Sequence, residues 1–442
     1  MTPLPHEITG FRTADAPTAE LLEACVRCGA CVQSCPTYQE IGIEPDDPRG
    51  RVFLVTAVHD AQLPMDETFE KHIYQCLDCR ACETVCPMGV QVGRIIEEAR
   101  GEIRAVRPAK GWHGRILRLA LGQLFPYPWR MEILSSLMAL GQRSGVMGLA
   151  RRLGLMRVLP EHLQKIERHM PAAPLGSARR RLGRQVAAQG EVRGRIALLH
   201  GCVMNTLFAG ATEATARVLA RNGWEIMLPK DQTCCGALHV HEGDREGGKN
   251  LARQNIAAFE ASGAESYLVN AAGCGSAMKE YGLLLEHDPD WAERATAFSA
   301  RVRDVQEFLV GTGFAAPTGS FKARATYQDA CHLAHAQGIR RQPRELLKSV
   351  PGLTLKEMPD SDRCCGSAGI YNVSHPEIAD PLMRRKAADV PADVEVLVTA
   401  NPGCHLQLMR GLAEAGREVR VMHVMEVLDA AYRAEGKAAR GA

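Results

Sequence analysis

Two runs of cysteines with the same spacing lie in the first hundred residues. Each run has three cysteines at two-residue gaps, a fourth after three more residues, and a proline directly behind it. Three thiolates at such gaps converge on one face of an iron–sulfur cubane, and in proteins with two such runs the fourth cysteine ligates the other cluster. We therefore expect two [4Fe–4S] clusters, one on Cys25, Cys28, Cys31 and Cys86, the other on Cys35, Cys76, Cys79 and Cys82.

Zinc, which is also bound by paired cysteines, is the alternative for these runs. A zinc ion needs only four ligands and gives no reason for a third cysteine at the same gap, or for the trailing Pro36 and Pro87. Iron–sulfur clusters are therefore favoured. The arginines after the first run, Arg49 and Arg51, either reduce the charge of a cluster or simply cap and solvate a helix that begins near Pro48.

The other eight cysteines form a repeat. Cys202, a Cys–Cys–Gly run and Cys274 recur 129 or 130 positions later, which indicates a tandem duplication. Each set of four could ligate a cluster or metal ion, carry out thiol redox chemistry, or pack as small apolar side chains. The two candidate sets are Cys202, Cys234, Cys235 and Cys274, and Cys331, Cys364, Cys365 and Cys404.

Other signals near these cysteines are weaker. Five histidines could act as ligands or proton carriers, or could simply cap and pack. They are His239, His241, His332, His335 and His405. Gly273 and Gly275 lack the third glycine of a dinucleotide loop, because Met278 occupies that position. We expect no flavin or NAD on this chain and no catalytic residue, since the sequence has no paired-carboxylate, Ser-His-Asp or P-loop pattern.

Short β-rich runs alternate with amphipathic runs inside each repeat, as in an α/β unit with a parallel sheet. We expect a helix at 211–221 and strands at 195–200, 224–228, 266–270, 325–328, 354–358 and 394–399. The cysteines then follow strand ends, where open α/β sheets bind their ligands.

Length and spacing predict the domain organisation. The 442 residues exceed the size of one core, so several domains are expected. Forty residues between the two N-terminal runs and a helical pattern at 94–104 favour a helical two-cluster domain over a small β-rich one. The predicted fold class is multidomain α plus α/β: a helical ferredoxin-type domain (1–108), a basic helical connector (109–192) and a duplicated α/β cysteine-rich domain (193–315 and 322–435).

Charge and hydropathy limit where the protein works. A net charge of +2 argues against nucleic acid as a partner. The sequence has no apolar run of 18 residues and no apolar stretch behind a basic N-terminus, so we expect a cytoplasmic protein whose cysteines serve metals or redox chemistry. The basic, partly apolar connector is a candidate docking surface for a partner or for the membrane, or an ordinary connector with a solvated basic side.

The chain resembles a known family over nearly its whole length. The Cys–Cys–Gly repeats are similar to the cysteine-rich domain shared by heterodisulfide reductases, anaerobic glycerol-3-phosphate dehydrogenases, lactate-utilisation proteins and glycolate oxidase iron–sulfur subunits. Glycolate oxidase subunits are the most similar, through the runs Cys25 to Cys31, Cys35 to Tyr38, Asp47 to Arg51, Gly273 to Gly282 and Cys364 to Gly369. Ala277 and Gln407 stand where heterodisulfide reductase has a further cysteine for its five-cysteine non-cubane cluster.

The resemblance implies a role in electron transfer. It implies FAD-binding partner subunits that oxidise glycolate to glyoxylate, in an (S)-2-hydroxy-acid (glycolate) dehydrogenase complex, with electrons passing through this chain toward a quinone or another acceptor. It also makes the cytoplasmic face of the inner membrane a candidate location. The rival interpretations are a subunit of a lactate- or glycerol-3-phosphate-oxidising complex, a disulfide-reductase-type subunit, and an iron–sulfur redox sensor or scaffold without turnover.

Overall fold

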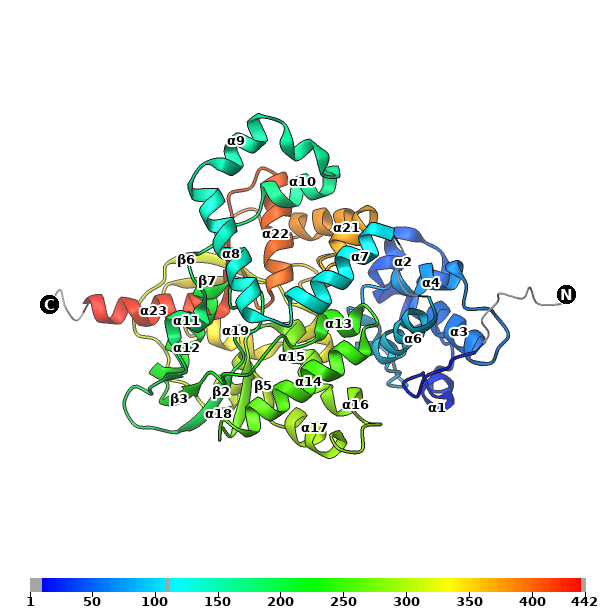
Figure 1. Cartoon of the computed structure of the whole chain (residues 1–442). Helices are drawn as coiled ribbons and strands as arrows, with labels where there is room; N and C mark the ends of the chain where they lie inside the picture. The colour runs from blue at the N-terminus through cyan, green and yellow to red at the C-terminus, as the bar shows by residue number, and fades with distance from the viewer. Residues whose placement is uncertain (1–9, 108–110, 439–442) are drawn as a thin grey trace.

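The computed structural model describes residues 10–107 and 111–438, arranged as Figure 1 shows. The N-terminal part is helical and lies at one end of the molecule (Figure 1). Asp47 caps α3 by accepting from the Gly50 amide, and Asp66 caps α4 by accepting from the Phe69 amide. The elements are α1 (Ala19–Glu23), η1 (Val32–Ser34), α2 (Pro36–Ile41), η2 (Glu44–Asp46), α3 (Pro48–His59), α4 (Glu67–Tyr74), α5 (Ala81–Thr84) and α6 (Val92–Val106).

Apolar side chains of α3, α4 and α6 form the core of this helical part. Val55, Ile73, Ile95 and Ile96 are fully buried in it. The start of α3 at Pro48 and the course of α6 confirm the helices expected in this region. The two cysteine runs lie in short loops beside this core, so packing of the helices positions the thiols.

Each cysteine repeat forms a parallel sheet, and the two sheets share one strand order. The first sheet has the order β1-β3-β2-β4-β5 and the second β7-β6-β8-β9, with β1 as the antiparallel edge. The strands are β1 (Gln185–Val186), β2 (Gly194–Leu198), β3 (Trp224–Met227), β4 (Ser266–Val269), β5 (Val302–Asp304), β6 (Ala323–Tyr327), β7 (Leu353–Lys356), β8 (Val396–Thr399) and β9 (Arg420–His423). This confirms the expected fold class and strands; β1, β5 and β9 were not predicted.

Helices cover both sheets and connect the repeats. In the first repeat they are α12 (Ala209–Arg221), α13 (Ala237–His241), α14 (Arg245–Glu260), α15 (Ala272–Lys279), α16 (Tyr281–Leu284), α17 (Ala292–Ser299) and α18 (Val305–Thr312). In the second they are η5 (His332–Ala336), α19 (Arg341–Lys348), α20 (Tyr371–Ser374), α21 (Pro376–Ala388), α22 (Pro402–Glu414) and α23 (Val424–Ala438).

The last helix of each repeat packs on the first helix of the other. α23 lies against α12, where Arg217 donates to both carboxylate oxygens of Asp429 at 2.9 and 2.7 Å. By the same exchange α18 packs on α19. Buried side chains of both repeats, among them Leu219, Leu309 and Leu428, belong to one core. The two repeats therefore form one packed body.

The connector between the helical part and the first sheet is an excursion of short helices. Figure 1 shows α8, α9 and α10 standing away from the sheets. Pro128 begins α8 and so separates it from the preceding helical turns. The elements are α7 (Gly111–Leu119), η3 (Ala120–Leu124), α8 (Pro128–Arg143), α9 (Val146–Arg152), η4 (Leu155–Val158), α10 (Glu161–Arg168) and α11 (Ala178–Leu182). Among the described helices, none is long and apolar enough to cross a membrane.

Candidate iron–sulfur centres

The first cysteine run folds around a small cavity. Its lining includes Cys25, Cys28, Cys31 and Cys86, the four thiols that the sequence assigns to one cluster, together with Cys82. Arg27 and Gly29, on either side of Cys28, have φ values of 57° and 82°. This left-handed backbone turns the loop sharply, which points the three thiols of the run toward one space.

The second run repeats this geometry around a second cavity. Asp78 and Arg80 flank Cys79 as Arg27 and Gly29 flank Cys28, with φ values of 48° and 61°. Non-glycine residues adopt this conformation at a cost, and such strain is found mainly at functional sites. The lining holds the four thiols of the other predicted set, Cys35, Cys76, Cys79 and Cys82. Cys82 lines both cavities, so the two sites are neighbours.

Arg51 lies beside the second cavity and is buried from solvent. Its Nη1 atom is 3.1 Å from Thr37 Oγ1 and 3.9 Å from Cys35 Sγ, and its Nε atom donates to the carbonyl of His72. Arg49, by contrast, is partly exposed and pairs with Glu44. Arg49 lines the first cavity and Arg51 the second, but only Arg51 is buried and directed at a cysteine sulfur.

The eight repeat cysteines line one large cavity of about 850 Å³. The loops after β4 and β8 meet there, because the Ala272 amide donates to the Ala400 carbonyl at 3.1 Å and the Gly273 amide to Asn401 Oδ1 at 3.2 Å. The cysteines follow the carboxyl ends of strands in sheets of reversing strand order, the usual ligand site of such sheets. The duplication thus brings both sets to the same space.

Within each set the thiols touch one another. Cys234 Sγ donates to Cys202 Sγ at 3.8 Å, and all sixteen cysteines, each within the described ranges, are free of disulfides. Hydrogen bonding between thiols, and then burial, raises the pKa of Cys202 and of Cys404 well above that of an ordinary thiol. Neutral buried thiols are poor nucleophiles, whereas a bound metal displaces their protons. Cys365 differs, because hydrogen bonds from Cys364 and Cys404 hold its pKa well below that of an ordinary thiol. Four thiols gathered in each set, one of them readily ionised, fit metal or cluster binding.

The second repeat lies directly on the loop of the second run. Cys79 and Cys364 belong to one buried apolar cluster, against which Cys331 packs. His332 Nε2 donates to the Asp78 carbonyl at 2.9 Å, and the Tyr371 hydroxyl donates to the Gln75 carbonyl at 3.0 Å. These contacts hold Cys331 next to the cavity of the second run.

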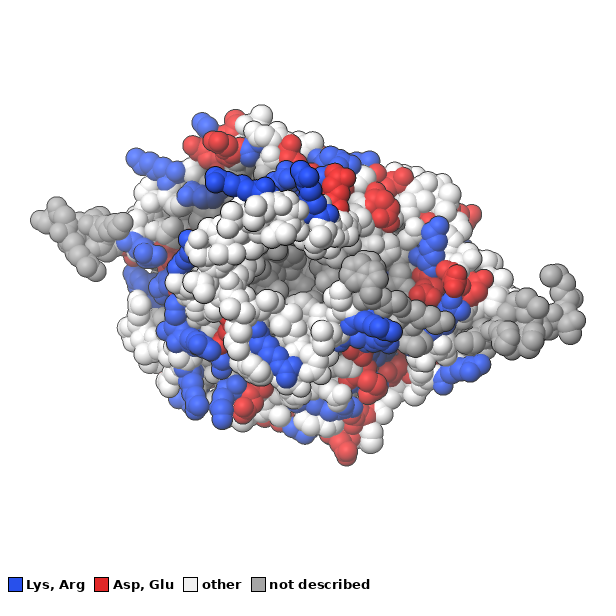
Figure 2. All heavy atoms as spheres, turned by 45° about the horizontal axis from the view of Figure 1, so that its top comes forward, with Lys and Arg blue, Asp and Glu red and all other residues white. Residues whose placement is uncertain are grey.

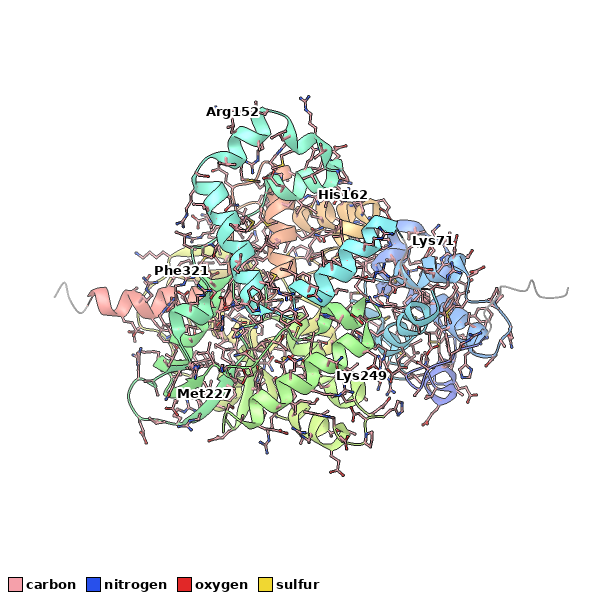
Figure 3. The ribbon with its side chains drawn as sticks, in the orientation of Figure 1. Lys71, Arg152, His162, Met227, Lys249 and Phe321 are labelled. Carbon is pink, nitrogen blue, oxygen red and sulfur yellow. The ribbon has the colours of Figure 1, made fainter. Side chains whose placement is uncertain are left out.

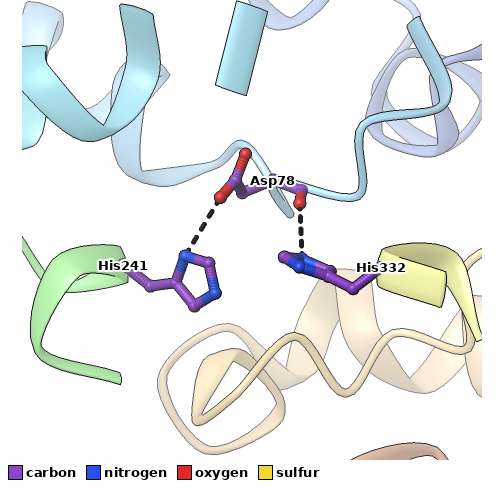
Figure 4. A group of neighbouring side chains, drawn as sticks. All are labelled: Asp78, His241 and His332. Carbon is purple, nitrogen blue, oxygen red and sulfur yellow. Dashed lines mark hydrogen bonds and ion pairs between the residues drawn. The ribbon is translucent and has the colours of Figure 1, made fainter. Parts of the chain in front are cut away.

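The five histidines divide into two groups. His239 contacts the Leu121 carbonyl, His335 contacts Thr84, and His405 packs against the ring of Phe208, and each of these contacts joins two parts of the chain. His241 and His332 instead converge on Asp78, as Figure 4 shows. Sequence reasoning did not single out Asp78, although its place between two cysteines of a run was the available signal.

Family models match most of the chain. A 4Fe-4S dicluster domain matches residues 21–90, a glycolate oxidase iron-sulfur subunit linker region matches 113–170, and a cysteine-rich domain matches both 196–279 and 325–409. The matched dicluster domain shows an iron–sulfur protein with two [4Fe–4S] clusters. The linker model covers the excursion from α7 to α10.

Named relatives extend over nearly the full length. The probable glycolate oxidase iron-sulfur subunit of Bacillus subtilis is 42% identical over 92% of this chain and 93% of its own. The chain belongs to the family of glycolate oxidase iron–sulfur subunits. The glycolate oxidase iron-sulfur subunit of Escherichia coli is 34% identical over 94% of this chain and 95% of its own. Lactate utilization protein A of Oceanobacillus iheyensis is 32% identical over 53% of this chain and 96% of its own.

Proposed function

We propose that this chain is the electron-transfer subunit of a glycolate-oxidising complex. FAD-binding partner subunits oxidise glycolate to glyoxylate, as in an (S)-2-hydroxy-acid dehydrogenase, and the electrons leave through this chain toward a quinone or another acceptor in or near the cytoplasm. The observation that carries the proposal is the placement of the two cavities with the N-terminal cysteines beside the cavity with all eight repeat cysteines. The match to lactate utilization protein A covers only half of this chain, so glycolate is favoured.

The ligand sets are part of the proposal. Cys25, Cys28, Cys31 and Cys86 bind one cluster and Cys35, Cys76, Cys79 and Cys82 the other, and the bound clusters supply one-electron centres. The two repeat sets, Cys202, Cys234, Cys235 and Cys274, and Cys331, Cys364, Cys365 and Cys404, are sites for further clusters or metal. The proposal keeps the division into residues 1–108, 109–192, 193–315 and 322–435.

The contact between Cys79 and the second repeat supports an order of transfer. Since Cys331 packs beside the second cavity, the second repeat is the neighbour of the cluster held there. The first repeat contacts the same helical part through polar groups, such as the two hydrogen bonds from Arg80 to Glu280. Electrons therefore pass between the second run and the second repeat.

The ligand sets are tested by measuring iron and acid-labile sulfide per chain on anaerobically prepared protein and by recording its EPR spectrum. The matched variant carries alanine at Cys234, Cys235, Cys364 and Cys365. More than eight irons in the wild type, falling toward eight in the variant, supports clusters in the repeats. Eight irons in both confines clusters to the N-terminal runs. Stoichiometric zinc without iron would refute electron transfer.

We propose in addition that the connector rests on an anionic membrane surface. Thirteen of the twenty-three large apolar side chains exposed among the described residues lie between Ile116 and Val158. Ile133, Leu134, Leu137 and Leu140 share one face of α8, and Val158 is 85% exposed. Residues 111–170 carry nine Arg and Lys against three Glu, whereas the whole chain has a net charge of only +2.

This combination fits a lipid surface better than open water. A basic helix with an exposed apolar face binds anionic headgroups and buries its apolar side. Figure 2 shows this side of the molecule, with a hollow bordered mainly by uncharged side chains and with Lys and Arg around it. Arg152 lies at the end of the excursion farthest from the sheets (Figure 3).

Vesicle sedimentation checks the membrane proposal. Full-length protein should bind vesicles with anionic lipid and not neutral ones, less at high salt, and Leu137→Ser with Leu140→Ser should weaken binding about tenfold or more. Leu283→Ser with Val373→Ser, exposed apolar positions elsewhere, is the matched control. Unchanged vesicle binding, with loss of flavoprotein co-purification, would assign the face to the partner instead.

A further inference from the structure

Three parts of the chain meet at Asp78. This residue lies between Cys76 and Cys79 of the second run and is only 4% exposed. His241 ends α13 of the first repeat, and His332 begins η5 of the second. Figure 4 shows both imidazoles pointing at Asp78 from opposite sides. The site therefore joins the helical part to both repeats.

The donor atoms converge without forming good hydrogen bonds. His241 Nδ1 is 3.0 Å from Asp78 Oδ2 and 3.1 Å from Glu97 Oε1. Yet His241 Nδ1 and Asp78 Oδ2 have no aligned hydrogen-bond partner among the described residues, and neither has His332 Nδ1. Ligand atoms of Asp78, His241 and His332 all lie within 4.8 Å of one another. Buried polar atoms that face each other without a well-aligned hydrogen bond need an explanation, and a bound ion that bridges them is one.

The charges around this point are also unbalanced. Arg80 is the shared cation for four carboxylates, with nitrogen–oxygen distances of 3.1 to 3.6 Å. Those carboxylates belong to Asp78, Glu83, Glu97 and Glu280. One guanidinium cannot neutralise four carboxylates, of which Asp78 and Glu97 are buried, and uncompensated buried charge is costly. A second source of positive charge is needed beside Asp78.

We propose that Asp78, His241 and His332 bind a divalent transition-metal ion such as Zn²⁺. Two imidazoles and carboxylate oxygens are a donor set that zinc accepts in tetrahedral geometry. The ion binds neutral imidazole and ionised carboxylate, releases any proton held at His241 Nδ1, and undergoes no redox change. It locks the loop of the second run to both repeats.

The competing arrangement is a protonated His241 bridging the two carboxylates. Burial alone would lower the pKa of His241, but hydrogen bonding and charge from Asp78 and Glu97 raise it to about 10. An imidazolium supplies one positive charge and has a single N–H directed at two oxygens. The metal-bound and the protonated arrangement differ in whether the protein holds a metal ion and, if it does, in which atoms neighbour that ion.

Zinc K-edge absorption distinguishes a bound metal ion from a protonated His241. The sample is full-length protein, purified anaerobically, equilibrated with Zn²⁺ and then dialysed against a chelator. We expect one zinc per chain with nitrogen and oxygen neighbours at about 2.0–2.1 Å, rather than sulfur at about 2.3 Å as in a cysteine site. His241→Gln and His332→Gln should each retain zinc at least about tenfold more weakly. His239→Gln, which alters a buried histidine of the same helix outside the cluster, should retain it.

Three results would overturn the proposal. In the first, wild-type protein with its full iron content holds no zinc even at saturating Zn²⁺. In the second, the bound zinc has only sulfur neighbours. In the third, both histidine variants retain as much zinc as the wild type. Asp78→Asn, which keeps the side-chain shape, replaces the histidine variants if circular dichroism or iron content shows that they misfold. No readout involves glycolate, so this test is independent of the proposed activity.

Discussion

At the scale of single residues, buried charge is concentrated around the second cysteine run. Arg51 is enclosed by Thr37, Asp46 and the His72 carbonyl, and its guanidinium faces Cys35 Sγ. N–H groups directed at cluster sulfur, and positive charge near a cluster, stabilise its reduced form. Arg51 is therefore placed to raise a reduction potential without touching substrate.

Arg51→Gln should lower the midpoint potential of the second cluster by about 60–130 mV. A hydrogen bond to a charged group contributes about 1.5–3 kcal/mol, and about 59 mV corresponds to 1.4 kcal/mol for one electron. EPR-monitored redox titration measures the shift. Arg49→Gln, at the neighbouring, partly exposed arginine that lines the first cavity, should leave the potential of the second cluster unchanged. Equal shifts in the two variants would mean that general surface charge, and not Arg51, sets the potential.

Buried imidazoles predict a pH dependence of stability. Burial lowers the pKa of His423 to about 4, where Nε2–H donates to the Asn270 carbonyl. Its unfolded pKa is about 6.5, so the folded state binds fewer protons between these values. The stability from neutral His423 is thus complete above about pH 6.5 and is lost as the pH falls toward 4, by at most about 1.4 kcal/mol per pH unit.

Urea unfolding at pH 6.5 and 5.5 checks this sign. The wild type should lose about 1 kcal/mol more than His423→Gln over this interval, because the variant lacks one of the buried titrating groups. His162→Gln, on the connector helix α10, should behave as the wild type. A steeper loss in His423→Gln would contradict the assignment.

At the scale of elements, the short β-rich runs before the cysteines were enough to predict the strands that precede them. β1, β5 and β9 were not predicted, and none of them leads directly to a cysteine. The grouping of Asp78 with His241 and His332 was also beyond the sequence, since tertiary packing brings three distant segments together. Local spacing predicts ligand runs, whereas contacts between modules depend on the packing of helices.

A buried carboxylate of the connector ties α8 both to α11, which is also part of the connector, and to Asn205 of the first repeat. Glu132 on α8 accepts from Arg179 Nε at 2.9 Å, Arg180 Nε at 2.8 Å and Asn205 Nδ2 at 3.2 Å. Burial raises the pKa of Glu132, but these donors prevail and lower it to about 2. The carboxylate therefore stays ionised and holds α8 in place at neutral pH.

Glu132→Gln should loosen the connector without removing clusters. Loss of the charged hydrogen bonds costs about 1.5 kcal/mol, which raises the population of locally opened connector about tenfold. Limited proteolysis should cut residues 111–170 about ten times faster, at unchanged iron content. Glu161→Gln, at an exposed pair with Lys165, is the matched control and should be cut at the wild-type rate.

At the scale of the whole molecule, the exchange of end helices makes the two repeats depend on each other. α23 belongs to the second repeat by sequence, yet it buries Val424, Val427 and Leu428 in the core shared with α12 of the first. Each such side chain contributes about 1.5–3 kcal/mol when buried. Their sum is comparable to the whole net stability of a domain, about 5–15 kcal/mol.

A chain that ends at residue 423 should therefore fail to fold in both repeats. The amides of β2 and β4 should lose their protection from hydrogen exchange, although these strands lie more than 150 residues before the deletion. In a chain that ends at residue 438 the same amides should stay protected. Arg217→Gln, which breaks the α12–α23 ion pair without a deletion, should lower stability by only about 1 kcal/mol. Retained protection of β2 and β4 in the chain ending at 423 would mean that the first repeat folds alone, so that the single cavity forms by docking of two finished domains.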